Sequence, residues 1–223
     1  LIVLMRAGQV PERVGDASGE APALHTSRER RNVIGLLALT MTLTLIATTA
    51  FMTALPKRVE DIGVVSREGL IGVGLLTGAI YLLASGAQFV GGHYADRGHA
   101  RRTYLMSFVL LGATFAVAAL TGNWMVLPLA VAVMFLFEAI APIETVFVAR
   151  YAPAARRGLF FGMRYAISVV GGPVGVWLVA ALYDPTARFA WLLTVLAAGA
   201  MVVALLALAL PRDREALALG AGK

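Results

Sequence analysis

The sequence predicts an all-α, polytopic membrane protein with six transmembrane helices. Hydrophobic residues make up 59% of the 223 residues, charged residues make up only 14%, and the mean hydropathy is +0.80. A soluble domain would carry about a quarter charged residues. The charges gather in short patches, and the apolar runs between them approach the ~20 residues with which a helix spans a bilayer. These runs are too uniformly apolar for the alternating strands of a membrane barrel.

The chain begins with a polar stretch that we predict to be a largely disordered cytoplasmic leader or linker, residues 1–32. Residues 6–32 are rich in Gly, Pro, Ala and charge, and such a composition buries too little apolar surface to fold alone. Residues 1–5 are apolar but too few for the core of a signal peptide, so we interpret them as the cut end of something longer.

Six apolar runs form the predicted bundle, residues 33–211, and a cytoplasmic tail follows over residues 212–223. Proline and glycine mark most of the boundaries, because proline cannot continue a helix and glycine favours helix ends. The runs are 33–55, ending at Pro56; 68–93; 102–121, ended by Gly122 and Asn123; 124–150; 158–183, ended by Asp184 and Pro185; and 188–210, ended by Pro211.

Basic residues predict the topology. Of the 19 lysines and arginines, 14 fall on one side of the predicted bundle, and Arg164 lies within a helix. The four on the other side are Lys57, Arg58, Arg67 and Arg188. Loops rich in Lys and Arg stay in the cytoplasm, so we expect both termini there, in a bacterial-type inner membrane. Topology explains the positive charge, and we predict no nucleic-acid partner.

The first predicted helix carries a threonine series. Thr40, Thr44 and Thr48 recur every four residues and therefore share one face of the helix. Two interpretations remain open: the hydroxyl groups bond to their own helix backbone, or the face lines a wet cavity. The third and sixth predicted helices are nearly pure hydrocarbon, and we expect them to face lipid.

Three ionisable residues lie within the predicted spans: Glu138, Glu144 and Arg164. Such groups need partners or water, because an unpaired charge in a bilayer is costly. Glu144 and Arg164 each lie roughly 9 Å inside the cytoplasmic ends of adjacent helices, and we hypothesise an ion pair between them, either architectural or part of a gate. Glu138 has no basic residue at its depth, which suits a proton-coupling or cation-binding group. The alternative is a glutamic acid hydrogen-bonded within the bundle.

Two sites of helix bending follow from proline and glycine. Pro142 lies four residues after Glu138 and cannot donate a hydrogen bond to its carbonyl group. In the next helix, Gly172 and Pro173 within residues 171–173 predict a break or bend, and Gly175 predicts close packing.

Catalytic and metal-binding patterns are missing from the sequence. The three histidines lie in predicted loops or at helix ends, and none pairs with a candidate nucleophile. There is no phosphate-binding loop, and with no cysteine there are no disulfides or thiolate metal sites. We therefore predict no enzyme activity, no metal and no cofactor.

Residues 91–102, "GGHYADRGHARR", lie between the second and third predicted helices on the cytoplasmic side. The stretch resembles the signature loop of the major facilitator superfamily, in which a glycine and three residues precede Asp-Arg, a glycine and paired basic residues. Here two further residues, His99 and Ala100, separate the second glycine from the basic pair. The matching residues are Gly92, Asp96, Arg97, Gly98, Arg101 and Arg102.

The resemblance implies the carboxyl-terminal six-helix half of a twelve-helix transporter, built as two inverted three-helix repeats and working by alternating access. It implies that helices 1 and 4 line the cavity, 2 and 5 border the other half, and 3 and 6 face lipid. The implied partners are the lipid bilayer, a small solute, protons, and the missing amino-terminal half or a second copy.

The resemblance also implies a conformational gate. The loop carboxylate, Asp96, would lie near the amino end of the fifth helix, around residues 157–160, where a helix terminus stabilises it by ~0.3–1 kcal/mol. Arg150 or Arg97 would supply the counter-charge, and Gly92 would allow the helices to approach closely.

We therefore expect secondary active transport of a small solute, coupled to protons. The alternative is a non-transport six-helix scaffold or assembly subunit, in which the polar faces of helices 1 and 4 pack dry against each other.

Overall fold

The computed structural model describes residues 27–61, 63, 70–121, 125–152, 157–184 and 189–211, and this part of the chain is helical without a strand. The predicted leader up to residue 26 and the predicted tail from residue 212 lie outside the described residues. The helices are α1 (Ser27–Asp61), α2 (Leu70–Ser85), α3 (Ala87–Tyr94), α4 (Ala100–Leu120), α5 (Val126–Tyr151), α6 (Arg157–Leu182) and α7 (Ala190–Ala207).

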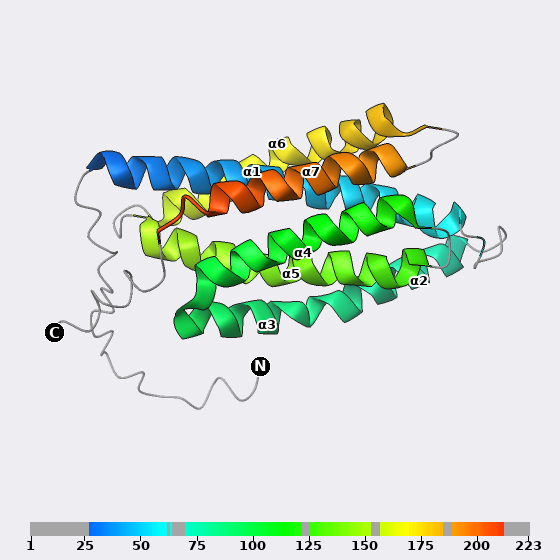
Figure 1. Ribbon diagram of the computed structural model, residues 1–223, viewed down its shortest axis with the longest axis horizontal. Coiled ribbons are helices and arrows are strands. Elements are labelled where there is room, and N and C mark those ends of the chain that lie inside the picture. The colour runs from blue at the N-terminus through cyan, green and yellow to red at the C-terminus, as the bar shows by residue number, and fades with distance from the viewer. Residues whose placement is uncertain are drawn as a thin grey trace, which may run out of the picture.

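Helix α5 is the central element of the bundle. It packs against α1, α2, α3 and α4, while α7 packs on α4 and α6 packs mainly on α1. Figure 1 shows the start of α1, the turn from α3 to α4 and the end of α7 at the same end of the bundle. The core between α1, α4 and α5 is aromatic: the rings of Phe51 and Phe115 meet edge-on, with their centroids 5.6 Å apart.

By length and composition, five described stretches are able to cross a membrane: Arg31–Asp61, Gly72–Leu120, Val126–Tyr151, Gly158–Leu182 and Ala190–Ala207. The second is 49 residues long because it holds both the predicted second and third helices, with a kink at Gly98 between them. The chain nevertheless turns back within it, between α3 and α4 (Figure 1).

This reversal is a π-helical turn, Ala95–His99, where the sequence predicts an open loop. Gly98 has φ 78° and ψ 19° within the turn. Side chains other than glycine rarely adopt this left-handed conformation. The second glycine of the loop motif is therefore required by the backbone, because it reverses the chain without an extended connection.

Helix α1 does not end at Pro56, as the sequence predicts, but continues to Asp61; it also begins at Ser27, within the predicted leader. Pro56 cannot donate to the carbonyl group of Met52, four residues earlier. The hydroxyl group of Tyr81, on α2, donates to that carbonyl at 3.4 Å. A neighbouring helix thus compensates for the hydrogen bond that proline removes, and the helix tolerates the residue.

The predicted break at residues 171–173 is also wrong, because α6 is one continuous helix from Arg157 to Leu182 with Pro173 inside it. Helix α5 likewise continues through Pro142. Bending at Pro142, Gly172 and Pro173 stays a prediction. The close packing predicted at Gly175 is confirmed: a Cβ atom there would lie 2.9 Å from the carbonyl oxygen of Ile46, on α1.

The close approach of α3 to α5 depends on Gly91, and the role of Gly92 in the predicted gate stays a prediction. A Cβ atom at Gly91 would collide with the carbonyl group of Ala139. At Gly92 the nearest atom would be the Cβ of Pro142, at 4.0 Å, which is ordinary van der Waals contact. The two adjacent glycines point in different directions around α3, and only the first faces the backbone of α5.

Candidate functional site

A cavity of about 170 Å³ lies between α1, α5 and α6, halfway along the bundle. Its polar groups come from two helices: Thr44 and Thr48 from α1, and Glu138 and Glu144 from α5. Ile167 closes it from α6. The remaining lining residues are apolar, namely Met41, Leu45, Phe137, Ile140 and Ala141.

The threonines bond to their own helix backbone, as the first interpretation has it, and Thr44 and Thr48 also line the cavity, whose wetness stays a prediction. The hydroxyl group of Thr44 donates to the carbonyl of Thr40, and that of Thr48 to the carbonyl of Thr44, each at 2.8 Å. Their protons are therefore used within the helix, while their oxygen atoms remain as acceptors in the cavity wall. Thr40, also predicted to line the cavity, does not: it is fully buried and its hydroxyl donates to the carbonyl of Leu37.

Glu138 takes its partner from α3. The side-chain amide of Gln88 donates to Oε2 of Glu138 at 2.6 Å. On α5, Glu138 is the residue before Ala139, whose carbonyl group lies against Gly91 of α3. This close contact brings the two helices near enough for the hydrogen bond between Gln88 and Glu138. An amide donor orients a carboxyl group but carries no charge to neutralise it. Among the described residues, no salt bridge includes Glu138.

Glu144 is buried and takes a partner from α4. The hydroxyl group of Tyr104 donates to Oε1 of Glu144 at 3.4 Å. The side chain of Arg164, predicted to pair with Glu144, lies outside the described residues. Each of the two carboxyl groups of the cavity thus accepts a hydrogen bond from a neutral donor on a different neighbouring helix.

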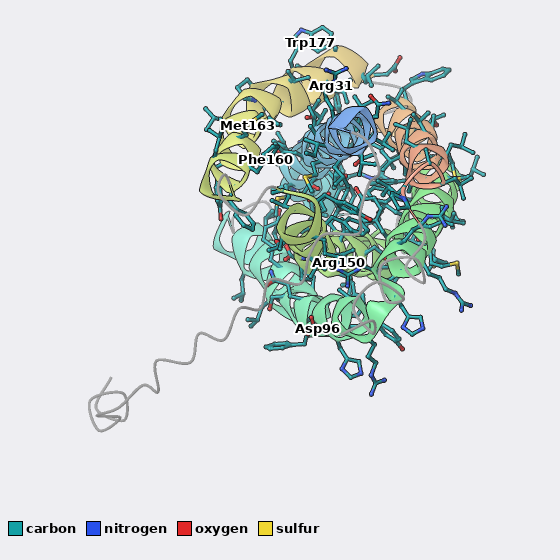
Figure 2. All side chains as sticks on the ribbon, turned by 90° about the vertical axis from the view of Figure 1, so that its left-hand side faces the viewer. Arg31, Asp96, Arg150, Phe160, Met163 and Trp177 are labelled. Atoms are coloured by element: carbon teal, nitrogen blue, oxygen red, sulfur yellow. The ribbon has the colours of Figure 1, made fainter. Side chains whose placement is uncertain are left out.

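The structure places Asp96 away from the amino end of α6. Asp96 is exposed in the turn after α3, and Figure 2 shows it beyond Arg150, well separated from Phe160 on α6. The packing explains this, because α3 lies against α5 whereas α6 lies mainly against α1. No hydrogen bond or ion pair joins Asp96, Arg97 or Arg102 to another residue in the described part of the chain.

Two arginines of the predicted gate bind backbone carbonyl groups. Arg150, at the end of α5, donates from Nη2 to the carbonyl of Ala95 at 3.2 Å and so holds the turn between α3 and α4. Arg101, at the start of α4, donates from Nη2 to the carbonyl of Leu208 at 2.6 Å. A cation at the carboxyl end of a helix satisfies its open carbonyls and its dipole, so Arg101 ties α4 to the end of α7.

Sequence reasoning misses Gln88, Gly91 and Tyr104. A polar residue in an apolar helix is a signal in its own right, and this rule would have identified Gln88. Tyr104 carries no local signal, because its partner lies 40 residues away on another helix. Gly91 and Gly92 differ only in the direction they face, which depends on how α3 packs.

The fold and the cavity define a polytopic helical membrane protein with a partly open cavity between its helices, lined by apolar side chains and four polar ones. The model of the Major Facilitator Superfamily matches residues 37–222, most of the sequence, and the chain belongs to this superfamily. Members of this family are membrane transporters. No curated protein matches the chain.

Proposed function

We propose that the chain forms half of a secondary active transporter that moves a small solute by alternating access, with the solute path at the cavity of α1, α5 and α6. The observation that carries this proposal is the cavity itself, whose lining includes two glutamates from α5 and two threonines from α1. In a scaffold subunit with dry packing, these polar faces would be in contact. The six-helix half with two inverted repeats and cytoplasmic termini agrees with α1 starting and α7 ending at one end of the bundle (Figure 1).

The second half of the pathway is an amino-terminal half or a second copy of the chain. Helix α6 supports this proposal, because it packs mainly on α1 and exposes apolar side chains along its length. Figure 2 shows Trp177 pointing away from the bundle. In this arrangement α2, α3 and α6 border the second half, and the turn with Asp96, Arg97, Arg101, Arg102 and Arg150 responds to its movement.

Glu138 is the proposed proton-coupling group. It lines the cavity, and its described partner is the neutral amide of Gln88. An ionised Glu138 therefore keeps a negative charge at the cavity wall, which a proton or a cationic group of the solute neutralises on binding. A carboxyl group locked in an ion pair would not be available in this way.

Substitution Glu138→Gln tests the coupling in the whole-length protein. Liposomes containing the protein and a pH-sensitive dye are exposed to a panel of small sugars, amino acids and organic cations. We expect one class of solute to drive proton movement with wild type. With Glu138→Gln we expect proton movement to fall to the level of empty liposomes, because the amide cannot take up a proton.

The matched control is Glu60→Gln, the same change at an exposed residue that pairs with Lys57 near the end of α1, outside the cavity. It should behave as wild type. Unchanged pH-dependent uptake in Glu138→Gln would remove this residue from the mechanism.

A further inference from the structure

The polar groups that line the cavity between α1, α5 and α6 are hydrogen-bond acceptors. The hydroxyl groups of Thr44 and Thr48 donate their protons to the carbonyls of Thr40 and Thr44, so their oxygen atoms can only accept from a ligand. The other two polar lining residues are glutamates, whose ionised carboxyl groups also only accept. Among the described residues of the lining, none has a basic or an amide side chain. A ligand that fits this wall must bring its own donors.

Glu138 has one carboxyl oxygen left for such a ligand. Its Oε2 accepts from the side-chain amide of Gln88 at 2.6 Å, and Gln88 lies on α3, outside the cavity lining. No further hydrogen bond or ion pair joins Glu138 to the described part of the chain. The amide therefore holds the carboxyl group from outside the cavity, and Oε1 remains without a partner.

The position of Glu138 decides which charge the cavity favours. This residue lies halfway along α5 (Val126–Tyr151), which is long and apolar enough to cross a membrane. An ionised carboxylate at that depth is costly unless a positive charge accompanies it. A neutral solute would leave the charge uncompensated and an anion would add to it, whereas a cation is attracted more strongly than in water because the surroundings are apolar.

The rest of the wall favours an organic cation over a metal ion. A hard metal ion such as Ca²⁺ needs about six oxygen ligands, and the described residues contain no group of metal-binding side chains. The cavity volume of about 170 Å³ is close to the roughly 150 Å³ of an apolar cavity that holds one benzene ring. The side chains available to surround such a ring are Met41, Leu45, Phe137, Ile140, Ala141 and Ile167.

We propose that the cavity binds a protonated primary amine whose apolar body is about the size of one six-membered ring. The ammonium group donates to Oε1 of Glu138, and the threonine oxygens of α1 are acceptors for its remaining N–H groups. The ring lies among the apolar side chains of the three helices. This inference rests on the proposed transport function, for which it names the chemical class of the solute.

Calorimetric titration of the purified whole-length protein in lipid nanodiscs at neutral pH tests the inference, with the heat from empty nanodiscs subtracted. Benzylamine is the cationic probe, because alkyl amines are protonated at this pH. Benzyl alcohol and benzoate carry the same ring without the positive charge, and ammonium chloride carries the cation without the ring. We expect benzylamine to bind at least about ten times more tightly than any of the other three, because charged hydrogen bonds and ring burial both contribute.

Glu138→Gln removes the negative charge and nearly keeps the shape of the side chain. We expect its affinity for benzylamine to fall to about that for benzyl alcohol, because an amide supplies no counter-charge. Its affinity for benzyl alcohol should stay within about threefold of wild type. Glu60→Gln, the exposed control near the end of α1, should bind benzylamine as wild type does.

Thr48→Val removes an acceptor of the cavity wall and leaves Glu138 in place. We expect its affinity for benzylamine to fall by about two- to tenfold, the effect of one lost hydrogen bond. Thr194→Val is the matched control, because this threonine also donates to the carbonyl four residues earlier but lies on an exposed face of α7. It should leave the affinity unchanged.

Three results would overturn the inference: benzylamine that does not bind to the folded wild type, benzyl alcohol or benzoate that binds as tightly as benzylamine, or a preference for the cation that survives in Glu138→Gln. If Glu138→Gln does not fold, the comparison of probes in wild type and the affinity of Thr48→Val still decide, and an unchanged affinity in Thr48→Val contradicts the proposed site.

Transport is measured separately, in liposomes that contain the same protein. Selective binding of benzylamine by a protein that moves no solute would contradict the proposed function alone. Proton-coupled movement of a neutral solute by a protein without preference for the cation would contradict the inference alone.

Discussion

Replacing Gly91 with alanine is expected to lower the free energy of unfolding by about 1–3 kcal/mol, in spite of the better helix propensity of alanine. The added methyl group would collide with the carbonyl group of Ala139, which belongs to the backbone of the central helix and cannot rotate away. Helix α3 must then move off α5, and the hydrogen bond from Gln88 to Glu138 lengthens or breaks. Thermal or denaturant unfolding in detergent, followed by tryptophan fluorescence, measures the effect.

Gly92→Ala provides the matched control one residue along. Its methyl group would meet only the Cβ of Pro142, at 4.0 Å, so stability should stay within about 0.5 kcal/mol of wild type or rise slightly. If Gly92→Ala destabilises the protein and Gly91→Ala does not, then the motif glycine makes the close contact and the packing of α3 described above is wrong.

Gly175→Ala is expected to loosen α6 from α1, again at a cost of about 1–3 kcal/mol. A Cβ atom at this position would lie 2.9 Å from both the carbonyl oxygen of Ile46 and the Cβ of Thr49, and 3.0 Å from the amide nitrogen of Ala50. Two of these three atoms are backbone, so the helices must separate. Because α6 depends on α1 for most of its packing and supplies Ile167 to the cavity, limited proteolysis should also cleave α6 sooner.

Gly172→Ala serves as the control on the same helix. A Cβ there has open space around it, so we expect unchanged or slightly higher stability. The same variant tests the predicted bend. If α6 flexes at Gly172 during transport, alanine at this position should lower the transport turnover of the protein and leave its stability unchanged. Equal destabilisation by both substitutions would show that propensity or backbone freedom, and not contact with α1, decides the effect at Gly175.

The apolar runs predict the helical membrane protein well, because burial in lipid leaves a signal in every residue of a span. The polar residues Glu138, Glu144, Thr44 and Thr48 are predicted for the same reason, since their cost in a bilayer makes them conspicuous. Their partners are not predictable in this way. Which neighbour reaches Glu138 or Glu144 depends on how each helix is rotated and on which helices pack together. The pattern of apolar residues in a single sequence does not show either.

In the loop motif, too, the sequence predicts which residues matter but not what they contact. The sequence identifies Gly98, Arg101 and Arg150 as important, but their roles follow from backbone geometry: a left-handed turn, and two sets of carbonyl groups at helix ends. The expected position of Asp96 beside α6 depends on which helices are neighbours, and the packing of α6 on α1 moves that contact away. The role of Asp96 as a latch stays a prediction that requires a second half of the transporter.

Cysteine accessibility tests the central claim, that the cavity is a wet solute path, most directly. These 223 residues contain no cysteine, so an introduced thiol is the only target among them, and any cysteine elsewhere in the whole-length protein is first replaced by serine. Thr48→Cys places it in the cavity wall, and Thr194→Cys places it on an exposed face of α7 that we expect to contact lipid. The pair is matched, because each threonine donates to the carbonyl four residues earlier, at 2.8 and 2.9 Å.

The measurement is the rate at which a charged, water-soluble methanethiosulfonate reagent modifies each variant of the whole-length protein in lipid nanodiscs. Only a thiolate in contact with water reacts. The account predicts rapid modification of Thr48→Cys and little of Thr194→Cys. An unreactive Thr48→Cys, in a protein that is folded and whose thiol becomes reactive on denaturation, would show that the polar faces of α1 and α5 are dry and would contradict the transport pathway proposed for this chain.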